Sequence, residues 1–241
     1  MQMTRRQMMA AGALGATSLA TGNLGKAAKA VAGQAPNPVL LPVPEVLPEK
    51  VFTTDRVGIS RRTHENHLAL WQGYTRETNE VRTVLSNFDY SEANPGQIYS
   101  EFRGIKVNYA FAYGGYVNHL VYFDGIGGEG GEPNGALMDL INRSFGSFDR
   151  WVEDFRATGL SGRGWAYLAY DPISNILFNY IGDGQDTFPA WNNSLILALD
   201  VYEHAYYFDF GRNRGEYIDA FMQVIDWSAV EAKLPPEALR A

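Results

Sequence analysis

The sequence contains no cysteine. This absence excludes disulfides, thiolate metal sites and cysteine nucleophiles, so a metal site in this chain must use nitrogen and oxygen ligands. Histidine is scarce as well, with four residues, at positions 64, 67, 119 and 204. A metal site rich in histidine would therefore have to use nearly all of them.

The chain also lacks a basic stripe of the kind that binds nucleic acids. Its formal net charge is −7, and because residues 1–30 contain four basic side chains and no acid, the chain without them would carry −11. An acidic surface repels phosphate backbones, so we expect no nucleic-acid partner. Hydrophobic residues make up 46% of the 241 residues, enough to bury the core of one domain or of two small ones.

The apolar run near the N-terminus is too short and too rich in glycine to span a bilayer, so we expect no stable membrane insertion. Residues 1–30 have the three parts of an export signal: Arg5-Arg6, an Ala/Gly/Leu run to about Leu24, and Ala28-Lys29-Ala30. The paired arginines resemble a twin-arginine signal with cleavage after Ala30. We therefore expect a periplasmic protein, or one otherwise exported by the twin-arginine route; the alternative is an uncleaved basic helix.

The next segment, residues 31–50, is predicted to be an extended arm because five prolines lie within it. A long helix is expected from Ser60, as its cap, to about Leu85. A second helix is expected from about Lys106 to Phe123, broken by Gly114-Gly115. Together they predict a helical hairpin domain over residues 51–126.

The glycine-rich stretch Gly125–Pro133 is predicted to be a hinge-like linker between domains. The alternative, a phosphate-binding loop, is disfavoured because no strand precedes it. Beyond it, the patterns predict helices at 135–144, 147–158 and 214–226, and strands at 165–170, 176–181 and 195–201. The predicted fold is α+β: the N-terminal helical hairpin, then a C-terminal domain over 127–241 with a three-stranded antiparallel sheet and flanking helices.

The chemistry is concentrated between Asp200 and Tyr207, where a carboxylate and the imidazole of His204 stand four residues apart among aromatic residues. A hard oxygen donor beside a nitrogen donor suits a first-row transition metal ion, and surrounding aromatic rings would keep the site dry. Taken alone, the two residues could equally be a buried polar pair. His64 is interpreted as a solvated residue on an exposed helix face.

Four blocks of sequence resemble the iron/manganese superoxide dismutase family over about residues 47–227. They are Ile59–Thr63 leading into His67; Asn118-His119 with Tyr122 and Phe123; Gly130–Gly135 continuing to Ser144–Phe148; and Asp200–Tyr207. The third block resembles the family's interdomain signature at almost every position. The fourth matches the family's best-known motif except at Tyr202, where a tryptophan is usual.

By this resemblance, the metal ligands are His67, His119, Asp200 and His204, with a solvent molecule as the fifth ligand. They would hold one manganese or iron ion per subunit. In the implied reaction one superoxide ion gives up an electron and leaves as dioxygen, and a second accepts it and leaves as hydrogen peroxide. Proton uptake on reduction would keep the charge of the buried site constant.

The resemblance also implies roles for residues around the metal. Gly184-Gln185-Asp186 resembles the run that brings the manganese-type glutamine to the bound solvent, and Gly115 stands where the iron-type glutamine would be, so manganese is slightly favoured. Trp165 matches an aromatic residue that lines the metal pocket. Arg214 matches the arginine at the mouth of the substrate channel, where it would attract the superoxide anion.

Glu203 and Tyr207 match residues of the family's dimer interface, which implies a homodimer. The chain departs from the family at Trp71-Gln72, where two histidines are usual, and at Tyr74, which lies one residue before the position of the gateway tyrosine. A shift of one residue rotates a helical side chain by about 100°, so we expect Tyr74 to reach the site only if the helix is irregular. These departures leave an alternative open: a metal-binding, dismutase-like protein with a structural or partner-binding role, or with a different oxidation activity.

Overall fold

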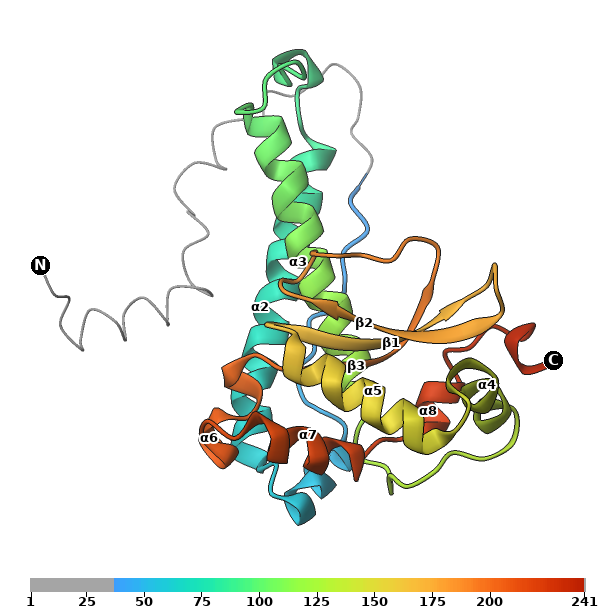
Figure 1. Cartoon of the computed structure of the whole chain (residues 1–241). Coiled ribbons are helices and arrows are strands. Elements are labelled where there is room, and N and C mark those ends of the chain that lie inside the picture. The colour runs from blue at the N-terminus through green and yellow to red at the C-terminus, as the bar shows by residue number, and fades with distance from the viewer. Residues whose placement is uncertain (1–36, 241) are drawn as a thin grey trace, which may run out of the picture.

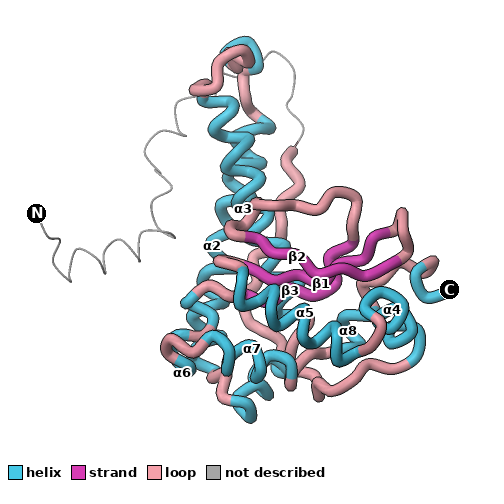
Figure 2. The backbone as a smooth tube through the Cα atoms, viewed as in Figure 1, coloured by secondary structure: helices cyan, strands magenta, loops and turns pink. Residues whose placement is uncertain are grey.

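The computed structural model describes residues 37–240, which fold into a helical hairpin packed against an α+β layer (Figures 1 and 2). The signal predicted at residues 1–30 lies outside the described residues. No helix within residues 37–240 is long and apolar enough to cross a membrane. The predicted fold class is confirmed.

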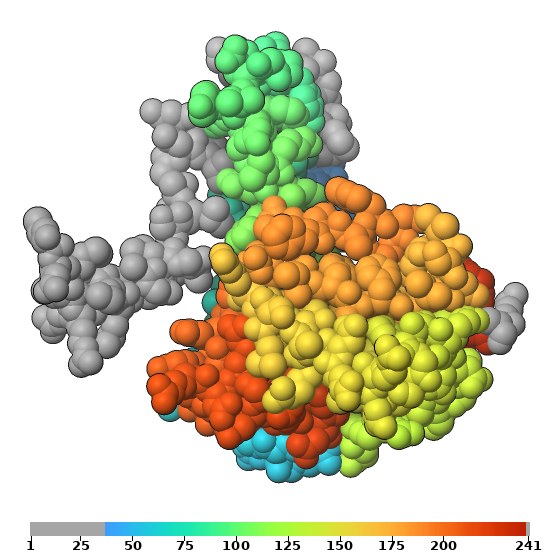
Figure 3. All heavy atoms as spheres, viewed as in Figure 1, coloured from blue at the N-terminus to red at the C-terminus, as the bar shows by residue number. Residues whose placement is uncertain are grey.

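The hairpin consists of α2 (Arg61–Ser86) and α3 (Glu101–Asp124), which lie antiparallel and side by side. Both helices begin at a serine cap: Ser60 accepts a hydrogen bond from the backbone N–H of Thr63, and Ser100 accepts one from that of Arg103. The short 3-10 turn η3 (Tyr90–Glu92) lies in the connection between the helices. In the space-filling view the far end of the hairpin, in green, rises above the sheet and the helices that follow it in the chain (Figure 3).

The predicted break of the second helix at Gly114-Gly115 is wrong, because α3 is continuous through both glycines. A glycine costs a helix only about 1 kcal/mol relative to alanine, and the tertiary contacts of a long amphipathic helix outweigh that. The two glycines serve close packing instead. Their backbone closely approaches Gln185 and Tyr74.

The described part of the proline-rich arm, residues 37–48, is extended as predicted and lies along the hairpin. Three side chains of α2 bind its backbone. Asn79 exchanges two hydrogen bonds with Leu41, of 2.7 and 2.8 Å; Arg82 donates to the carbonyl of Val39; and Gln72 donates to that of Pro44. The arm passes into η2 (Glu49–Val57), which precedes α2.

The sheet has three antiparallel strands in the order β2-β1-β3. They are β1 (Trp165–Asp171), β2 (Ile176–Gly182) and β3 (Ser194–Asp200), each within a residue or two of its predicted range. The β1–β2 turn includes Asn175, whose φ of 53° is left-handed, as asparagine tolerates. In the register, Trp165 lies opposite Asp200, so the central strand begins where the last one ends.

Helices surround the sheet and close the main core. They are α4 (Gly135–Phe145), α5 (Phe148–Ser161), α6 (Tyr207–Phe210), α7 (Arg214–Met222) and α8 (Trp227–Glu231), with the 3-10 turns η4 (Glu203–Ala205) and η5 (Ala238–Arg240). The predicted helix over 214–226 is wrong at its end. The chain leaves α7 after Met222, Ile225 forms a β-bridge with Ile126, and Asp226 caps α8.

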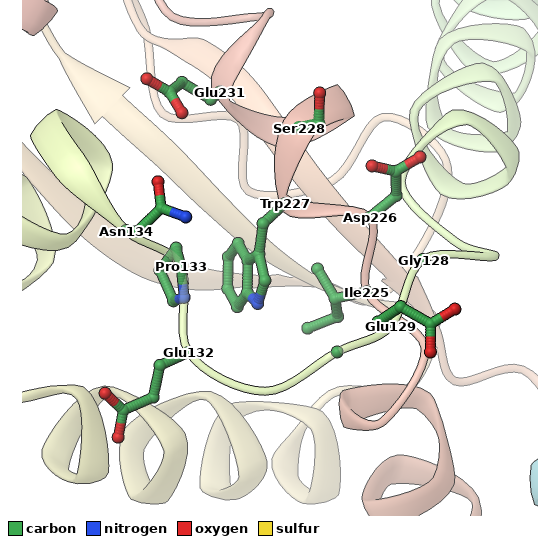
Figure 4. Close-up of a pocket in the computed structure, with 11 residues that line it drawn as sticks. Gly128, Glu129, Glu132, Pro133, Asn134, Ile225, Asp226, Trp227, Ser228 and Glu231 are labelled. Carbon is green, nitrogen blue, oxygen red and sulfur yellow. The ribbon is translucent and has the colours of Figure 1, made fainter.

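The glycine-rich connector before α4 is packed closely against two other segments. Its role as a hinge-like linker between domains stays a prediction. A Cβ added at Gly127 would lie 2.2 Å from the backbone oxygen of Lys50. A Cβ added at Gly128 would lie 2.5 Å from the Cα atom of Asp226. The Lys50 ammonium lies 2.7 Å from the Asp226 carboxylate and joins the same segments. Beside the connector, Trp227 lies across a pocket of about 410 Å³ (Figure 4).

Candidate metal centre

Four side chains converge on one buried point between the hairpin and the sheet: His67, His119, Asp200 and His204. One ligand atom from each lies within 4.8 Å of the others. The Oδ2 atom of Asp200 is 3.0 Å from Nε2 of His67, 3.1 Å from Nε2 of His204 and 3.9 Å from Nε2 of His119. Three imidazole nitrogens thus surround one carboxylate oxygen.

Each donor comes from a different element. His67 lies on α2, His119 on α3, Asp200 at the end of β3 and His204 in the turn η4. The first three side chains are fully buried, while that of His204 is 31% exposed. The backbone N–H of Tyr202 donates to Oδ1 of Asp200 at 2.8 Å, which leaves Oδ2 facing the three rings.

The environment of His119 shows that these residues fit a metal ion. Its Nδ1–H donates to the backbone oxygen of Gly115 at 2.6 Å, which leaves a lone pair on Nε2. Among the described residues, the buried Nε2 atom has no hydrogen-bond partner. A buried polar atom without a partner is costly, and a metal ion at the centre of the four donors would satisfy it.

The charge states of the three fully buried residues also favour a cation. Burial lowers the pKa of His119 to about 3, and burial lowers that of His67 despite the opposing effect of Asp200. Burial alone would raise the pKa of the Asp200 carboxyl, but interactions with His204 and His67 hold it below its usual range. The buried imidazoles are neutral and the acid is ionised, which are the forms that bind metals.

Gln185 lies beside the centre in the β2–β3 loop, with its amide held on both sides. Its Oε1 accepts hydrogen bonds from Nε1 of Trp165 at 3.1 Å and from Nδ2 of Asn118 at 3.2 Å. Its Nε2 donates to the hydroxyl of Tyr74 at 3.1 Å. The two bonds to Oε1 fix the amide orientation and so aim both N–H groups.

The Gly114-Gly115 pair of α3 makes room for this arrangement. A Cβ on Gly114 would lie 2.2 Å from the backbone oxygen of Gln185, and a Cβ on Gly115 would lie 2.5 Å from the ring of Tyr74. The Gln185 loop and the Tyr74 ring therefore occupy the space of two missing side chains. A glutamine at position 115 would collide with Tyr74.

Tyr74 reaches the centre without the helix irregularity that we expected from the sequence. The helix α2 is regular from Arg61 to Ser86. The ring centroid of Tyr74 lies 5.3 Å from that of His119, which faces His67 across the hairpin. The physical reason is the spacing. Seven residues are nearly two helical turns, so Tyr74 lies on the same face of α2 as His67.

Aromatic rings enclose the imidazoles. Trp165, fully buried, meets His119 edge to face at 5.2 Å between centroids, and Tyr122 and Phe123 lie 4.9 and 5.0 Å from His67. Tyr202, in the place of the usual tryptophan, stacks on His204 at 5.5 Å and donates its hydroxyl to the backbone oxygen of Asp183. The aromatic shell expected from the sequence is therefore present.

The interpretation of His64 as a solvated residue is wrong. Its side chain is buried, and one ring nitrogen lies 2.7 Å from the hydroxyl of Thr54. Burial lowers the pKa of His64 to about 3. The error arose because the exposure of the first turn of α2 depends on η2, which packs against it and brings Thr54 to the ring.

The other residues inferred from the sequence lie at the edge of the site. Arg214 is half-buried and donates to the backbone oxygen of Gly162 at 2.7 Å, with its guanidinium 5.7 Å from the ring of Tyr206. Glu203 is exposed, and Tyr207 is 54% exposed. None of the three belongs to the four-donor cluster.

Sequence reasoning assigned no role to Asn118, although it precedes a ligand. Its side chain is 5% exposed and donates to both the backbone and the side-chain oxygen of Gln185. A polar residue within the apolar end of α3 was the available signal, because a buried amide must find partners. Only the fold shows that its partner comes from residue 185.

Comparisons with known proteins agree with this centre. Residues 133–233 match the family of iron/manganese superoxide dismutases, C-terminal domain. The manganese superoxide dismutase 1 of Halobacterium salinarum is 36% identical over 165 residues, which cover 68% of this chain and 78% of that protein.

Other relatives are iron superoxide dismutases. That of Aquifex aeolicus is 38% identical over 184 residues, covering 73% of this chain and 84% of the relative. That of Pyrobaculum aerophilum is 34% identical over 176 residues, covering 71% and 80%. Relatives of both metal types therefore match most of the folded chain.

Proposed function

The chain belongs to the iron/manganese superoxide dismutase family, and we infer that it is a metal-dependent superoxide dismutase. It converts superoxide to dioxygen and hydrogen peroxide at the centre formed by His67, His119, Asp200 and His204. The convergence of these four donors within 4.8 Å is the observation that supports this function most directly. A manganese or iron ion, when bound there, supplies the one-electron oxidation and reduction.

The residues around the ion supply protons and orientation. Burial raises the pKa of Tyr74 to about 12, so its phenol stays protonated and can pass a proton towards the site. Gln185 holds the Tyr74 hydroxyl, and Trp165 and Asn118 hold Gln185. Since hydrogen peroxide forms only when superoxide takes up protons, we propose that Tyr74 and Gln185 form the proton path into the centre.

Superoxide consumption by the purified protein tests the activity. The wild-type protein, with its metal content measured, is compared with His119→Ala and with Gly73→Ala, a change in α2 that meets no atom within 4 Å. We expect turnover in the wild type and in Gly73→Ala, and its loss in His119→Ala. Bound metal without turnover would contradict the proposal and favour a structural role.

We propose manganese as the preferred ion. Gln185 reaches the centre from the β2–β3 loop, and Gly115 leaves no room for a glutamine from α3. Because ligand identity does not separate manganese from iron, the outer amide is the available lever on the reduction potential. Separate reconstitution with each ion checks this: greater turnover with iron would reverse the assignment.

Arg214 is proposed to attract superoxide. Its guanidinium is fixed by Gly162 and Tyr206 and is a local positive charge on a protein of net charge −7. In Arg214→Leu, kcat/KM should fall and lose part of its dependence on ionic strength, whereas Arg214→Lys should keep that dependence. Equal salt dependence in all three proteins would contradict this role.

A homodimer is proposed from the exposure around His204. Among the four proposed ligands, His204 alone has a partly exposed side chain, at 31%. Its neighbours Glu203 and Tyr207 are exposed as well. A second copy placed there would shield the centre from water. Sedimentation of the wild type should give a dimer, and a Glu203→Ala, Tyr207→Ala double variant should shift it towards monomer. A wild-type protein that stays monomeric at micromolar concentration would exclude it.

Export by the twin-arginine route is proposed from residues 1–30 alone. This route carries folded proteins, so the metal could be inserted before export. Replacing Arg5 and Arg6 by lysine should stop processing of the precursor and keep the protein in the cytoplasm. Unchanged export of that variant would refute the proposal.

A further inference from the structure

A row of aromatic rings leads from the ligand His67 through the hairpin to its surface. The successive centroid distances are 5.0 Å from His67 to Phe123, 5.5 Å to Trp71, 6.4 Å to Tyr116, 6.1 Å to Tyr113 and 5.7 Å to Tyr109. All of these distances lie in the range of aromatic rings in contact. The first four rings alternate between α2 and α3, and the last three, from Tyr116 outwards, all lie on α3. The inner part of the row therefore exists only because the two helices pack side by side.

The order of the rings suits one-electron transfer outwards. Trp71 is 8% exposed, and tryptophan and tyrosine are the side chains that lose an electron most readily. Phe123, which is not readily oxidised, lies between His67 and Trp71. The distance that an electron must cross there is short, because His67 and Trp71 are four residues apart on the same face of α2. The row reaches the surface at Tyr113, which is 39% exposed, and continues to the half-buried Tyr109.

Arg82 lies against the outer end of this row. Its Nε and Nη2 atoms each donate a hydrogen bond of 3.2 Å to the hydroxyl oxygen of Tyr109. Its guanidinium also lies 5.5 Å from the ring of Tyr113. The phenol oxygen of Tyr109 therefore accepts both of these bonds, and the guanidinium places a positive charge at the outer end of the row.

A second set of rings starts at His119 but ends less favourably. It runs through Trp165 and Tyr167 to Tyr180, with distances of 5.2, 6.1 and 4.7 Å. Burial raises the pKa of both tyrosines, so loss of the phenol proton on oxidation is costly there. The row through Trp71 is therefore the easier outlet.

We propose that this row, Trp71, Tyr116, Tyr113 and Tyr109, carries oxidising equivalents from the metal centre to the hairpin surface when hydrogen peroxide reacts at the centre. The inference depends on the proposed function, because the centre must hold a redox-active ion and the dismutation supplies the peroxide. Hydrogen peroxide takes up two electrons and two protons and gives two waters. Two tyrosines each give up one electron and the phenol proton.

The tyrosyl radicals formed in this way end as surface products. When two tyrosyl radicals meet, a carbon–carbon bond forms between their rings and gives dityrosine. This coupling needs no further oxidant. Oxidation at Tyr113 takes the place of oxidation at the ligand imidazoles, which would destroy the centre. The row thus protects the ligands from the product of the enzyme's own reaction.

Peroxide treatment of the iron-loaded protein tests the proposal, with the zinc-loaded protein as a control that has no redox chemistry. Peptide mass spectrometry locates the oxidised residues, and dityrosine fluorescence reports coupling. Tyr99 is an internal control, since it is 92% exposed and lies outside the row. We expect oxidation of Tyr113 and Tyr109 above that of Tyr99 with iron, and no such preference with zinc.

Variants separate a relay from simple exposure. Trp71→Phe should lose most of the oxidation at Tyr113 and gain oxidation at the ligand histidines, whereas Trp71→Tyr should retain the wild-type pattern. Tyr116→Phe, which removes only a hydroxyl, should shift oxidation back to Trp71; Tyr90→Phe, at an exposed tyrosine outside the row, should change nothing.

Superoxide turnover, measured on the same preparations, keeps the two proposals distinct. Oxidation of Tyr99 before Tyr113, or an unchanged pattern in Trp71→Phe, would overturn the relay even with full turnover. Absent turnover in a metal-loaded protein would instead contradict the dismutase function. Preferential oxidation at Tyr180 would also overturn the relay, since it would place the outlet on the other row.

Discussion

Gly114→Ala should damage the metal centre through a residue that binds no metal. The added Cβ would lie 2.2 Å from the backbone oxygen of Gln185 and 2.9 Å from its carbonyl carbon. Normal contact requires a separation of about 3.5 Å, so the Gln185 loop would have to move by about 1 Å. Such overpacking costs about 1–3 kcal/mol of stability.

The matched control is Gly73→Ala, because Gly73 lies within α2 and its added Cβ would meet no atom within 4 Å. There the substitution should stabilise the helix by about 0.5–1 kcal/mol. For a protein of this size, 1 kcal/mol changes the melting temperature by about 2–4 °C. The two alanine variants should therefore change Tm in opposite directions.

The effect on activity should exceed the effect on metal binding. The four ligands are untouched in Gly114→Ala, so the metal content should stay near that of the wild type. A displacement of Gln185 by about 1 Å separates it from Tyr74 and should lower superoxide turnover by roughly 100-fold. The measurements are thermal unfolding, metal analysis and turnover; if Gly114→Ala behaves like Gly73→Ala in all three, the packing argument is wrong.

Three further predictions concern the centre and its surroundings. Burial lowers the pKa of His64 from 6.5 in the unfolded chain to about 3 in the folded protein, so only the unfolded chain gains a proton as the pH falls below 6.5. From pH 6.5 down to pH 3 the wild type should therefore lose about 1.4 kcal/mol of stability per pH unit relative to His64→Gln. Equal acid sensitivity of the two proteins in denaturant titrations would contradict this. Asp200→Asn removes the anionic ligand, so this variant should keep little metal after dialysis. The control Asp149→Asn, at the exposed start of α5, should keep its metal. Full metal occupancy of Asp200→Asn would refute the ligand assignment. Gln185→Ala leaves the buried Nε1–H group of Trp165 without its acceptor and should lower turnover about 10–100-fold at unchanged metal content. A turnover like that of the wild type would exclude Gln185 from the mechanism.

Local chemistry was readable from the sequence wherever it depends on neighbours along the chain. The serine cap of α2 was predicted correctly because capping involves residues three apart, Ser60 and Thr63. The three strands were predicted to within a residue or two, since alternation and turn residues are local signals. The ligand set followed from the scarcity of histidine together with the family resemblance.

Features that depend on contacts between distant segments were not readable. The Gly114-Gly115 pair looked like a helix break, but its purpose is set by Gln185 and Tyr74, which come from other elements. His64 looked solvated because the sequence does not show that Thr54 covers it.

The sequence by itself determined that a metal site in this protein must use nitrogen and oxygen donors, because the chain has no cysteine. The family resemblance implied which three histidines and one aspartate, from the two halves of the chain, would supply them. The tertiary structure decided what surrounds them. The packing of α2 against α3 placed Tyr74 over Gly115 and Trp71 against Phe123, and the β2–β3 loop delivered Gln185. The physical reason is that helix and strand signals act over a few residues, whereas the space around an ion is set by side chains from every element that packs there.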